Sequence, residues 1–219
     1  MSDIVKMLVG SLSAHDETRD RSTQTDIGPS QIGDCRRRVF MQITNAPKVN
    51  QTDSIAAIMG TFIHAGIAEA IKRDDPFGDN FMIEQEFAYE GLRGHIDLYI
   101  KDKAQIIDWK TTKVKNLRFF PSDQQRMQVQ IYGYLLEMNG LPIETVTLVA
   151  LARDGSSKDI KEHSEPYDRK IAEQGLKWLA EVKEAAEKNL PPAPEKEVYF
   201  CRDYCDYYDP TGVNGCPAK

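Results

Sequence analysis

Two short segments that alternate charged and apolar residues constrain this chain most strongly. They are GHID at residues 94–97 and IIDWK at residues 106–110. Side chains alternate between the two faces of a β-strand, so we expect Asp97 to share a face with His95 and Tyr99. By the same rule, Asp108 shares a face with Lys110. If the two strands are neighbours, two carboxylates and one ammonium group meet on one side of a sheet.

Two neighbouring carboxylates resist joint ionisation, which makes such a pair costly without a counter-charge. A divalent cation removes this conflict, and hard oxygen ligands suit Mg²⁺ or Mn²⁺. Lys110 could then orient an attacking water and neutralise charge on a phosphate during its hydrolysis. The alternative is a surface hairpin in which Asp108 forms a salt bridge with Lys110 or Lys113. These two segments alone do not decide between the two interpretations.

The surrounding pattern predicts an α/β fold with a mixed central sheet flanked by helices. We expect strands at 81–89, 94–101, 105–110 and 143–152, the first two joined as a hairpin around Gly91. We expect helices over 31–44, from Thr52 or Asp53 to 72, from Pro121 or Ser122 to 138, and over 166–189. Residues 13–30 are polar and turn-prone, and we expect a loop there.

Charge and composition limit the class of protein without choosing a function. The net charge is −6, although positive residues cluster at 36–38 and along a stretch that contains Lys101, Lys103, Lys110, Lys113, Lys115 and Arg118. Such clusters are either a nucleic-acid footprint or a solvated face. We find no apolar run near the ~20 residues of a membrane span and no leader-like N-terminus. The expectation is a soluble, cytoplasmic protein with no membrane partner.

The four cysteines are unevenly distributed along the chain. Cys35 stands alone, whereas Cys201, Cys205 and Cys216 lie close together near the C-terminus. Structural disulfides are rare inside cells, so metal or cluster ligation is the leading interpretation. Thiolates favour Zn²⁺ or an iron–sulfur cluster. A shared site requires the fold to bring both ends of the chain together.

Four motifs, taken in order, resemble the RecB-like branch of the PD-(D/E)XK nuclease superfamily. They are GTFIH at 60–64, GHID at 94–97, IDWK at 107–110 and QVQIY at 128–132, and the resemblance covers about residues 33–137. It implies a restriction-endonuclease-like core. It also implies that the chain hydrolyses phosphodiester bonds with the help of a divalent metal.

The resemblance assigns roles to individual residues. It makes His64, Asp97, Asp108 and the Trp109 backbone carbonyl the metal ligands and Lys110 the catalytic lysine. It places Gln128 and Tyr132 on a helix that lines the DNA groove. Several alternatives remain open: His64 as a core histidine, Glu86 as a further acid or an exposed strand residue, and Gln130 with Tyr134 in place of Gln128 with Tyr132.

The cysteine arrangement resembles the CRISPR-associated RecB-like iron–sulfur exonucleases and the AddB-type helicase–nuclease subunits. Both have one cysteine before the nuclease core and three after it. The resemblance implies that Cys35, Cys201, Cys205 and Cys216 hold a structural [4Fe–4S] cluster that joins the N- and C-terminal segments. The gaps of three and ten residues are wider than is usual there. Zinc, and free buried or partly paired thiols, are therefore the alternatives.

Together these patterns predict a single nuclease domain over residues 1–219. Its parts are an N-terminal helical part at 31–72, a nuclease core at 81–152 and a C-terminal helix with the cysteine-bearing tail at 166–219. The expected function is that of a Mg²⁺- or Mn²⁺-dependent DNA exonuclease in recombination, repair or CRISPR adaptation, in a prokaryote or a phage. Its expected partner is DNA, single-stranded or with free ends. The alternatives are a catalytically inactive DNA-binding or scaffold relative, and a zinc-binding interaction protein.

Overall fold

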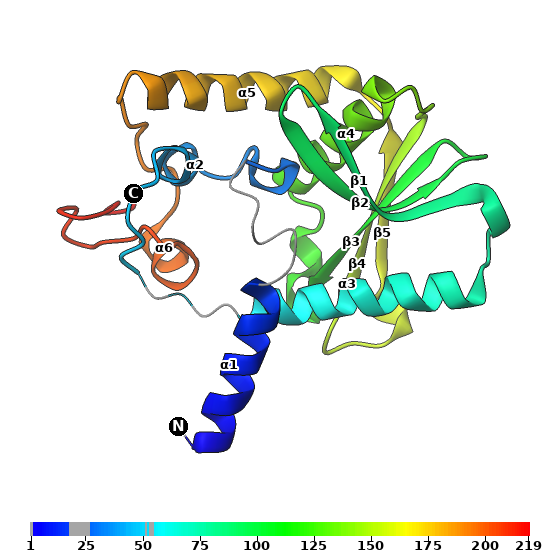
Figure 1. Ribbon diagram of the computed structural model, residues 1–219, viewed down its shortest axis with the longest axis horizontal. Helices are drawn as coiled ribbons and strands as arrows, with labels where there is room; N and C mark the ends of the chain where they lie inside the picture. The colour runs from blue at the N-terminus through cyan, green and yellow to red at the C-terminus, as the bar shows by residue number, and fades with distance from the viewer. Residues whose placement is uncertain (1, 18–26, 51, 53–54) are drawn as a thin grey trace. The chain divides into compact units, whose positions relative to one another are not determined.

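The computed structural model describes residues 2–17, 27–50, 52 and 55–219 (Figure 1). These residues divide into two compact units, and each is described by itself. The first unit comprises described residues within 1–27, 35–62 and 182–219, and it contains all four cysteines. The second comprises residues 28–34 and 63–181 and contains the sheet. This division leaves the single nuclease domain over 1–219 a prediction.

The second unit is built on a five-stranded sheet in the order β1-β2-β3-β4-β5. Its strands are β1 (Phe81–Tyr89), β2 (Leu92–Ile100), β3 (Gln105–Thr112), β4 (Thr145–Ala152) and β5 (Lys161–Pro166). Only β3 and β4 pair in parallel; the other neighbours are antiparallel. The mixed sheet and the α/β class are confirmed. The edge strand β5 was not predicted, because its sequence KEHSEP is polar and lacks an apolar alternation.

The hairpin between β1 and β2 has the predicted turn. Glu90 and Gly91 both have positive φ values, 47° and 79°. Two consecutive positive φ values define the type I′ turn, whose twist matches that of antiparallel strands. The Gly at the second position therefore fixes the pairing of β1 with β2.

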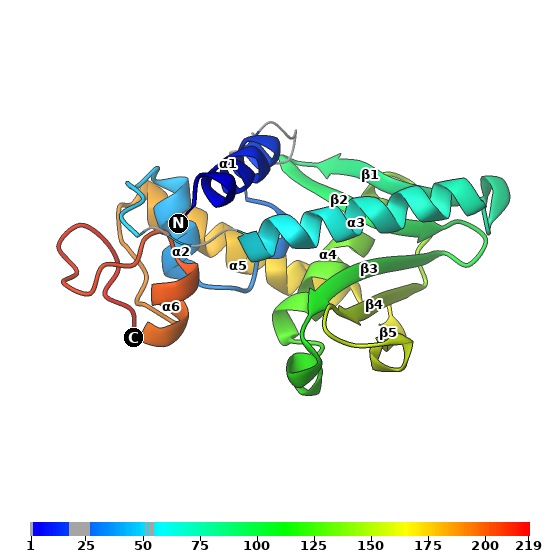
Figure 2. The same ribbon diagram turned by 90° about the horizontal axis from the view of Figure 1, so that it is seen from below.

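Helices lie on both faces of the sheet. Figures 1 and 2 show α3 (Ile55–Asp74) along one face and α4 (Asp123–Met138) along the other. On the α3 face, Ile67 and Ile71 pack against a core cluster that includes Leu98, Ile100 and Trp109. On the α4 side, α5 (Arg169–Glu187) approaches α4 closely, because a Cβ on Gly175 would lie 2.8 Å from Ile131 Cδ1.

Helix α4 begins and ends as predicted. The Ser122 hydroxyl accepts a hydrogen bond from the Gln125 backbone N–H. In turn, the Gln125 side-chain oxygen accepts one from the Ser122 backbone N–H. This capping box satisfies two amide groups at the N-terminus. At the other end, Asn139 is the C-cap and Gly140 has a φ of 78°. The left-handed conformation of Gly140 ends the helix in the usual way.

The first unit differs more from the sequence-based expectations. Its helices are α1 (Asp3–Glu17), α2 (Arg36–Ile43) and α6 (Val198–Tyr204). Helix α1 runs into the segment 13–30 that was expected to be a loop, and residues 18–26 lie outside the described part. Asp53 also lies outside it, and the Thr52 hydroxyl donates to Asp206.

The second unit also contains four short 3₁₀ helices: η1 (Pro29–Gln31), η2 (Gly78–Asn80), η3 (Val114–Phe119) and η4 (Ser157–Asp159).

The arginine run after Cys35 connects α2 to the segment that follows α5. The Arg36 backbone N–H and guanidinium both donate to the Glu195 carboxylate, at 2.7 and 3.0 Å. Arg37 Nη1 donates to the Pro192 carbonyl at 3.2 Å. These contacts lie within the first unit. At least two of the three arginines therefore stabilise that unit, which explains their charge without a nucleic-acid partner.

One helix corrects the expectation about membrane spans. Within the described ranges, α3 is long and apolar enough to cross a membrane, judged by length and composition alone. Gly60, Thr61 and Glu69 interrupt its apolar sequence, which is why no continuous run stands out. One such helix is weak evidence for a membrane span, and in this fold the His64 side chain of α3 contacts the sheet.

Candidate metal and catalytic site

The two aspartates meet where β2 and β3 separate. Three residue pairs join these strands, the last of them Leu98 with Ile107, so Asp97 and Asp108 would form the next pair. Instead of continuing the ladder, the Trp109 backbone N–H donates to Asp97 Oδ2 at 2.7 Å. Both aspartates are only 2% exposed. Asp97 and Asp108 therefore occupy facing positions at the end of the β2–β3 ladder, and the charge of Asp97 raises the pKa of Asp108. That both carboxylates share one side of the sheet stays a prediction.

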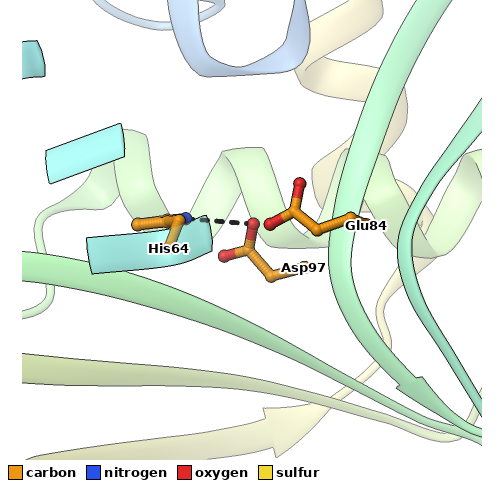
Figure 3. Close-up of side chains that lie close together, drawn as sticks. All are labelled: His64, Glu84 and Asp97. Atoms are coloured by element: carbon orange, nitrogen blue, oxygen red, sulfur yellow. Dashed lines mark hydrogen bonds and ion pairs between the residues drawn. The ribbon is translucent and has the colours of Figure 1, made fainter. Parts of the chain in front are cut away.

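A histidine and a third acid join this pair. His64 Nδ1 of α3 lies 3.2 Å from Asp97 Oδ1. Figure 3 shows the Glu84 carboxylate of β1 pointing toward the same two side chains. One ligand atom from each of His64, Glu84 and Asp97 lies within 4.8 Å of the others. Glu84 was missed in the sequence analysis, which considered Glu86 as the further acid.

Glu84 reaches the site because its backbone interrupts the strand. Its φ is 50°, a left-handed value that costs energy for a residue other than glycine. The regular alternation of side chains is also broken in β2, the strand paired with β1. Gly94 of β2 faces Tyr132 of α4, whereas Leu98 packs against α3 residues on the other face of the sheet. Residues four apart in a regular strand would share a face. The predicted common face from position 95 to position 99 is therefore wrong, and only the backbone conformation could have revealed it.

Glu86 does not join the cluster of acids. Its carboxylate lies 3.4 Å from His95 Nε2 and 3.9 Å from Arg93 Nη1, and its side chain is 41% exposed. This is the exposed-strand alternative from the sequence analysis. His95 accordingly contacts Glu86.

The predicted catalytic lysine is held by its neighbours on two sides. Lys110 Nζ lies 2.7 Å from Asp108 Oδ2 and donates to Gln128 Oε1 of α4 at 2.8 Å. Gln128 Nε2 in turn donates to the Tyr132 hydroxyl at 2.9 Å. Both α4 side chains are buried. The hydrogen bonds from Lys110 to Gln128 and from Gln128 to Tyr132 hold the Lys110 side chain in place. The spacing of Gln128 and Tyr132 allowed this arrangement or a direct contact with DNA.

Gln130, the competing glutamine, faces a different part of the unit. Its amide donates to Glu165 Oε1 and to the Pro166 carbonyl, and it accepts from the Asp168 backbone N–H. Tyr134 packs edge to face against Tyr89. Neither side chain contacts Lys110. The structure therefore separates the two equally spaced pairs that the sequence left open.

Burial and charge shift two pKa values in the cluster. Burial lowers the pKa of His64, but the hydrogen bond to Asp97 and the charges of Asp97 and Asp108 outweigh it, so that pKa is raised. Burial, opposed by Lys110 and reinforced by Asp97, raises the pKa of Asp108 to about 6. The His64 shift reflects the two neighbouring carboxylates, whereas the Asp108 shift comes mainly from burial. A bound cation would favour the charged form of the carboxylates.

The donor set fits a hard divalent cation. Glu84 and Asp97 offer carboxylate oxygens and His64 a ring nitrogen, all within 4.8 Å of one another. Asp108 acts on this group through its charge and is itself paired with Lys110. Carboxylates suit Mg²⁺ and Mn²⁺, and one imidazole is compatible with Mn²⁺. The Trp109 carbonyl leaves β3 on the same side as its N–H, which bonds to Asp97, because both groups of one strand residue point to the same neighbour.

Comparison with known proteins identifies the family. The PD-(D/E)XK nuclease superfamily matches residues 73–209, more than half of the chain. The chain belongs to the PD-(D/E)XK nuclease superfamily. A place in its RecB-like branch is consistent with this match. No curated protein matches the chain at a significant level.

Several solved structures align with this chain, and the first of them shows the same fold. The crystal structure of SSO0001 aligns with a TM-score of 0.58 and 23% identity, covering 100% of this chain and 98% of that one. An alkaline exonuclease from Laribacter hongkongensis aligns at 0.49 with 13% identity, covering 75% and 91%. A phage-related exonuclease from Haemophilus somnus 129PT aligns at 0.49 with 10% identity, covering 71% and 80%.

This PD-(D/E)XK chain also gathers its four cysteines in the first unit. All four are buried, and none of them forms a disulfide. Burial raises the pKa of the Cys205 thiol, and the nearby thiols of Cys216 and Cys35 raise it further. The Asn50 side chain donates to the carbonyls of Arg202 and Cys205, both at 2.9 Å. Residues near the two ends of the chain thus lie together, as the sequence analysis expected.

Proposed function

We propose that this chain is a divalent-metal-dependent DNA exonuclease that hydrolyses phosphodiester bonds. One observation carries the proposal. In a member of the PD-(D/E)XK nuclease superfamily, His64, Glu84 and Asp97 meet beside the ion pair of Asp108 with Lys110. Acids from three strands, a histidine and a half-buried lysine together form the kind of site that phosphate hydrolysis requires.

Four side chains and one carbonyl group are the proposed ligands. Glu84, Asp97, Asp108 and His64 would hold Mg²⁺ or Mn²⁺, with the Trp109 carbonyl as a backbone ligand. When bound there, the cation polarises a phosphate oxygen and lowers the pKa of a water molecule. The Trp109 N–H fixes one oxygen of Asp97, which leaves the other oxygen to face His64.

Lys110 is the proposed catalytic cation. Its ammonium group can donate to a phosphate oxygen or orient the attacking water, and it carries the charge needed to neutralise the transition state. Gln128 and Tyr132 are proposed to hold Lys110 in position. The 2.8 Å hydrogen bond from Lys110 to Gln128 and the 2.9 Å bond from Gln128 to Tyr132 support these roles.

We further propose a [4Fe–4S] cluster at Cys35, Cys201, Cys205 and Cys216, with a structural role. All four cysteines are buried in the first unit, and the thiols of Cys35 and Cys216 lie near enough to Cys205 to raise its pKa. Zinc held by the same thiolates is the alternative.

The remaining parts of the proposal concern partners and setting. The proposed substrate is DNA that is single-stranded or has free ends. The proposed setting is recombination, repair or CRISPR adaptation in the cytoplasm of a prokaryote or in a phage infection. These assignments rest on the family resemblance.

Cleavage assays test the nuclease proposal. Labelled single- and double-stranded DNA would be incubated with Mn²⁺ and either wild-type protein or Asp108→Ala. We expect wild-type degradation from ends, abolished by EDTA and by the substitution. Equal degradation by the two proteins would contradict the assignment. DNA binding without metal-dependent cleavage by the wild type would instead identify a catalytically inactive relative.

Metal analysis tests the cluster. Protein purified without oxygen should be coloured and contain iron and sulfide in equal amounts, with iron absent after Cys205→Ser. A colourless preparation that binds zinc through the same cysteines would contradict the iron–sulfur assignment. It would leave the nuclease proposal unaffected, since the cleavage assay tests the acid cluster and not the cysteines.

A further inference from the structure

The segment directly after the catalytic strand gathers positive and aromatic side chains on the surface. Helix η3 (Val114–Phe119) begins two residues after β3, the strand that carries Asp108 and Lys110. No acidic residue occurs from position 111 to position 122. Three cations occur in the same stretch, all with exposed side chains: Lys113, Lys115 and Arg118. This local excess stands out in a chain whose net charge is −6.

The backbone of η3 is fixed by neighbouring strands and loops. Lys161 Nζ of β5 donates to the carbonyls of Leu117 and Phe120, at 3.1 and 3.2 Å. The Val114 N–H donates to Asp154 Oδ1 at 2.9 Å. All these residues belong to the second unit. The exposed side chains of η3 therefore project from an anchored backbone.

Phe119 is exposed although an apolar core lies within the same unit. Its exposure is 67%, whereas the next residue, Phe120, is 9% exposed. The Arg118 guanidinium carbon lies 4.6 Å from the centroid of the Phe119 ring. A guanidinium over an aromatic ring forms a flat cationic surface. Leaving a phenylalanine ring in water forfeits the free energy of its burial, which calls for a functional explanation.

Lys113 and Lys115 are available for a partner. Neither has an ion pair with any residue the structure describes. By contrast, Lys110 and Lys161 are engaged with residues of their own unit. Exposed cations interleaved with an exposed aromatic ring match how proteins bind single strands, where cations follow the phosphates and rings stack on bases.

We propose that η3 binds an unpaired stretch of the DNA strand processed at Lys110, with Phe119 stacking on a base and Lys113, Lys115 and Arg118 contacting phosphates. The inference rests on the proposed nuclease function and names how that site holds its substrate. The backbone between Lys110 and Phe119 spans at most ~25 Å. This limit adds four extended residues at ~3.3 Å each to the six residues of the 3₁₀ helix at ~2.0 Å each. One strand of duplex DNA would cover that distance with about seven nucleotides at ~3.4 Å each, and a more extended unpaired strand with fewer.

A protein partner is the competing explanation for an exposed phenylalanine. The positive charge and the missing acids favour nucleic acid, because a phosphate backbone requires cations along its path. The position of η3 favours it as well, since η3 directly follows the strand that carries Asp108 and Lys110 and a DNA strand bound there can reach it. A protein-docking surface would leave DNA affinity unchanged when Phe119 is altered, so the same experiment separates the two.

Stacking is tested by fluorescence anisotropy with a labelled oligothymidylate of about 15 nucleotides in EDTA, which prevents cleavage. We expect Phe119→Ala to weaken binding about 5- to 150-fold, which is the ~1–3 kcal/mol of one base–aromatic stack. Phe119→Trp should retain affinity, whereas Phe119→Leu should lose it. Tyr199→Ala, which removes another exposed ring of 69% exposure, is the matched control and should bind like the wild type.

The phosphate contacts are tested by the salt dependence of the same binding. Lys113, Lys115 and Arg118 are replaced together by alanine. Each lost phosphate contact should reduce the slope of log affinity against log salt by ~0.7, so the triple variant should reduce it by about 2. The control removes three exposed lysines of α5, Lys170, Lys177 and Lys183, and so changes net charge equally. That control should leave the slope unchanged.

The outcomes separate this inference from the proposed function. If the wild type cleaves DNA with Mn²⁺ but the η3 variants bind oligothymidylate as it does, the inference fails and the nuclease proposal stands. A wild-type protein that does not bind oligothymidylate also overturns the inference. Loss of affinity in Phe119→Leu with rescue in Phe119→Trp supports it. Blunt duplex binding should be unaffected by Phe119→Ala, because paired bases are not free to stack on the ring.

Discussion

Three carboxylates from three strands lie together in the second unit, with one histidine and one lysine to balance them. Glu84 is held there by a backbone conformation that costs energy, and Asp108 has a pKa raised to about 6. Strain and desolvation of this kind persist where a site is organised for a ligand. At the scale of single residues, the cluster therefore has the properties of a cation site.

Glu84 and Glu86 offer a matched pair of substitutions two positions apart on β1. We expect Glu84→Gln to weaken Mn²⁺ binding about 10- to 100-fold, because it removes one of the ligand oxygens. Glu86→Gln should leave the affinity unchanged, since that carboxylate contacts His95 and Arg93 at the surface. Isothermal titration calorimetry measures both. Equal effects of the two substitutions would contradict the assignment of Glu84.

The sequence predicts most of this site but not all of it. His64, Asp97, Asp108 and Lys110 follow from the order of the motifs, and the strand alternation brings the two aspartates together. Glu84 could not be predicted, because its contribution depends on a φ of 50° within a strand that otherwise reads as regular. A periodic pattern carries no signal for one residue that departs from its period.

At the scale of elements, α4 contributes two glutamines with separate tasks. Gln128→Ala should lower the cleavage rate while leaving Mn²⁺ affinity and thermal stability nearly unchanged, because it only releases Lys110. Gln130→Ala should destabilise the fold, since it leaves the Asp168 N–H and the Pro166 carbonyl without a partner, at ~1–3 kcal/mol per buried group. Single-turnover kinetics and thermal unfolding distinguish them. The reverse assignment of effects would contradict the bracing role.

The edge strand β5 provides a prediction about acid stability. Burial raises the pKa of Glu165, but hydrogen bonds from Gln130, His163 and Arg126 outweigh it, so the pKa is lowered. A lowered carboxyl pKa stabilises the folded state above the unfolded value of about 4.3, and this contribution is lost as pH falls through the folded pKa. Glu165→Gln should therefore be destabilising at pH 7, with a difference that shrinks below about pH 4.

Chemical unfolding of both proteins across this pH range measures the difference. Glu162→Gln is the control, since the exposed Glu162 carboxylate accepts a hydrogen bond from the Ser164 hydroxyl at the surface of β5. A stability difference that stays constant from pH 7 to pH 3 would contradict the role given to Glu165.

Elements were predictable where their sequence is periodic or capped. The hairpin at Gly91, the capping box at Ser122 and four of the five strands are examples. Strand β5 and helix α6 were missed because their residues are polar or aromatic without a clear period. Helix α1 was missed because its sequence gives no strong start signal and exposes several apolar residues, among them Ile4 and Met7. In these elements contacts elsewhere in the fold decide the structure, and a local pattern does not.

At the scale of the whole molecule, the two compact units have separate chemistry. The first contains the four thiols and the second contains the acid cluster. The proposed cluster would stabilise the first unit by closing a chain segment from Cys35 to Cys216, because a ligand that binds only the folded state adds its binding free energy to stability. We therefore expect that loss of the iron also lowers the stability of the folded protein.

Cys205→Ser should remove the iron and lower the thermal midpoint by several degrees, since ~1 kcal/mol shifts it by ~2–4 °C in a chain of this size. Tyr204→Ser changes the adjacent, exposed residue of α6 and should retain both iron and midpoint. Iron analysis and calorimetry of the same preparations provide the comparison. A full iron content in Cys205→Ser would contradict this ligand assignment.

The most direct measurement is anomalous diffraction from crystals soaked with Mn²⁺. We predict one strong peak about 2.1 Å from carboxylate oxygens of Glu84, Asp97 and Asp108, a typical distance for a small divalent cation, and in contact with a ring nitrogen of His64. The peak should be absent in Asp108→Asn crystals. A wild-type crystal with Mn²⁺ bound elsewhere, or with these four side chains free of metal at saturating Mn²⁺, would contradict the account.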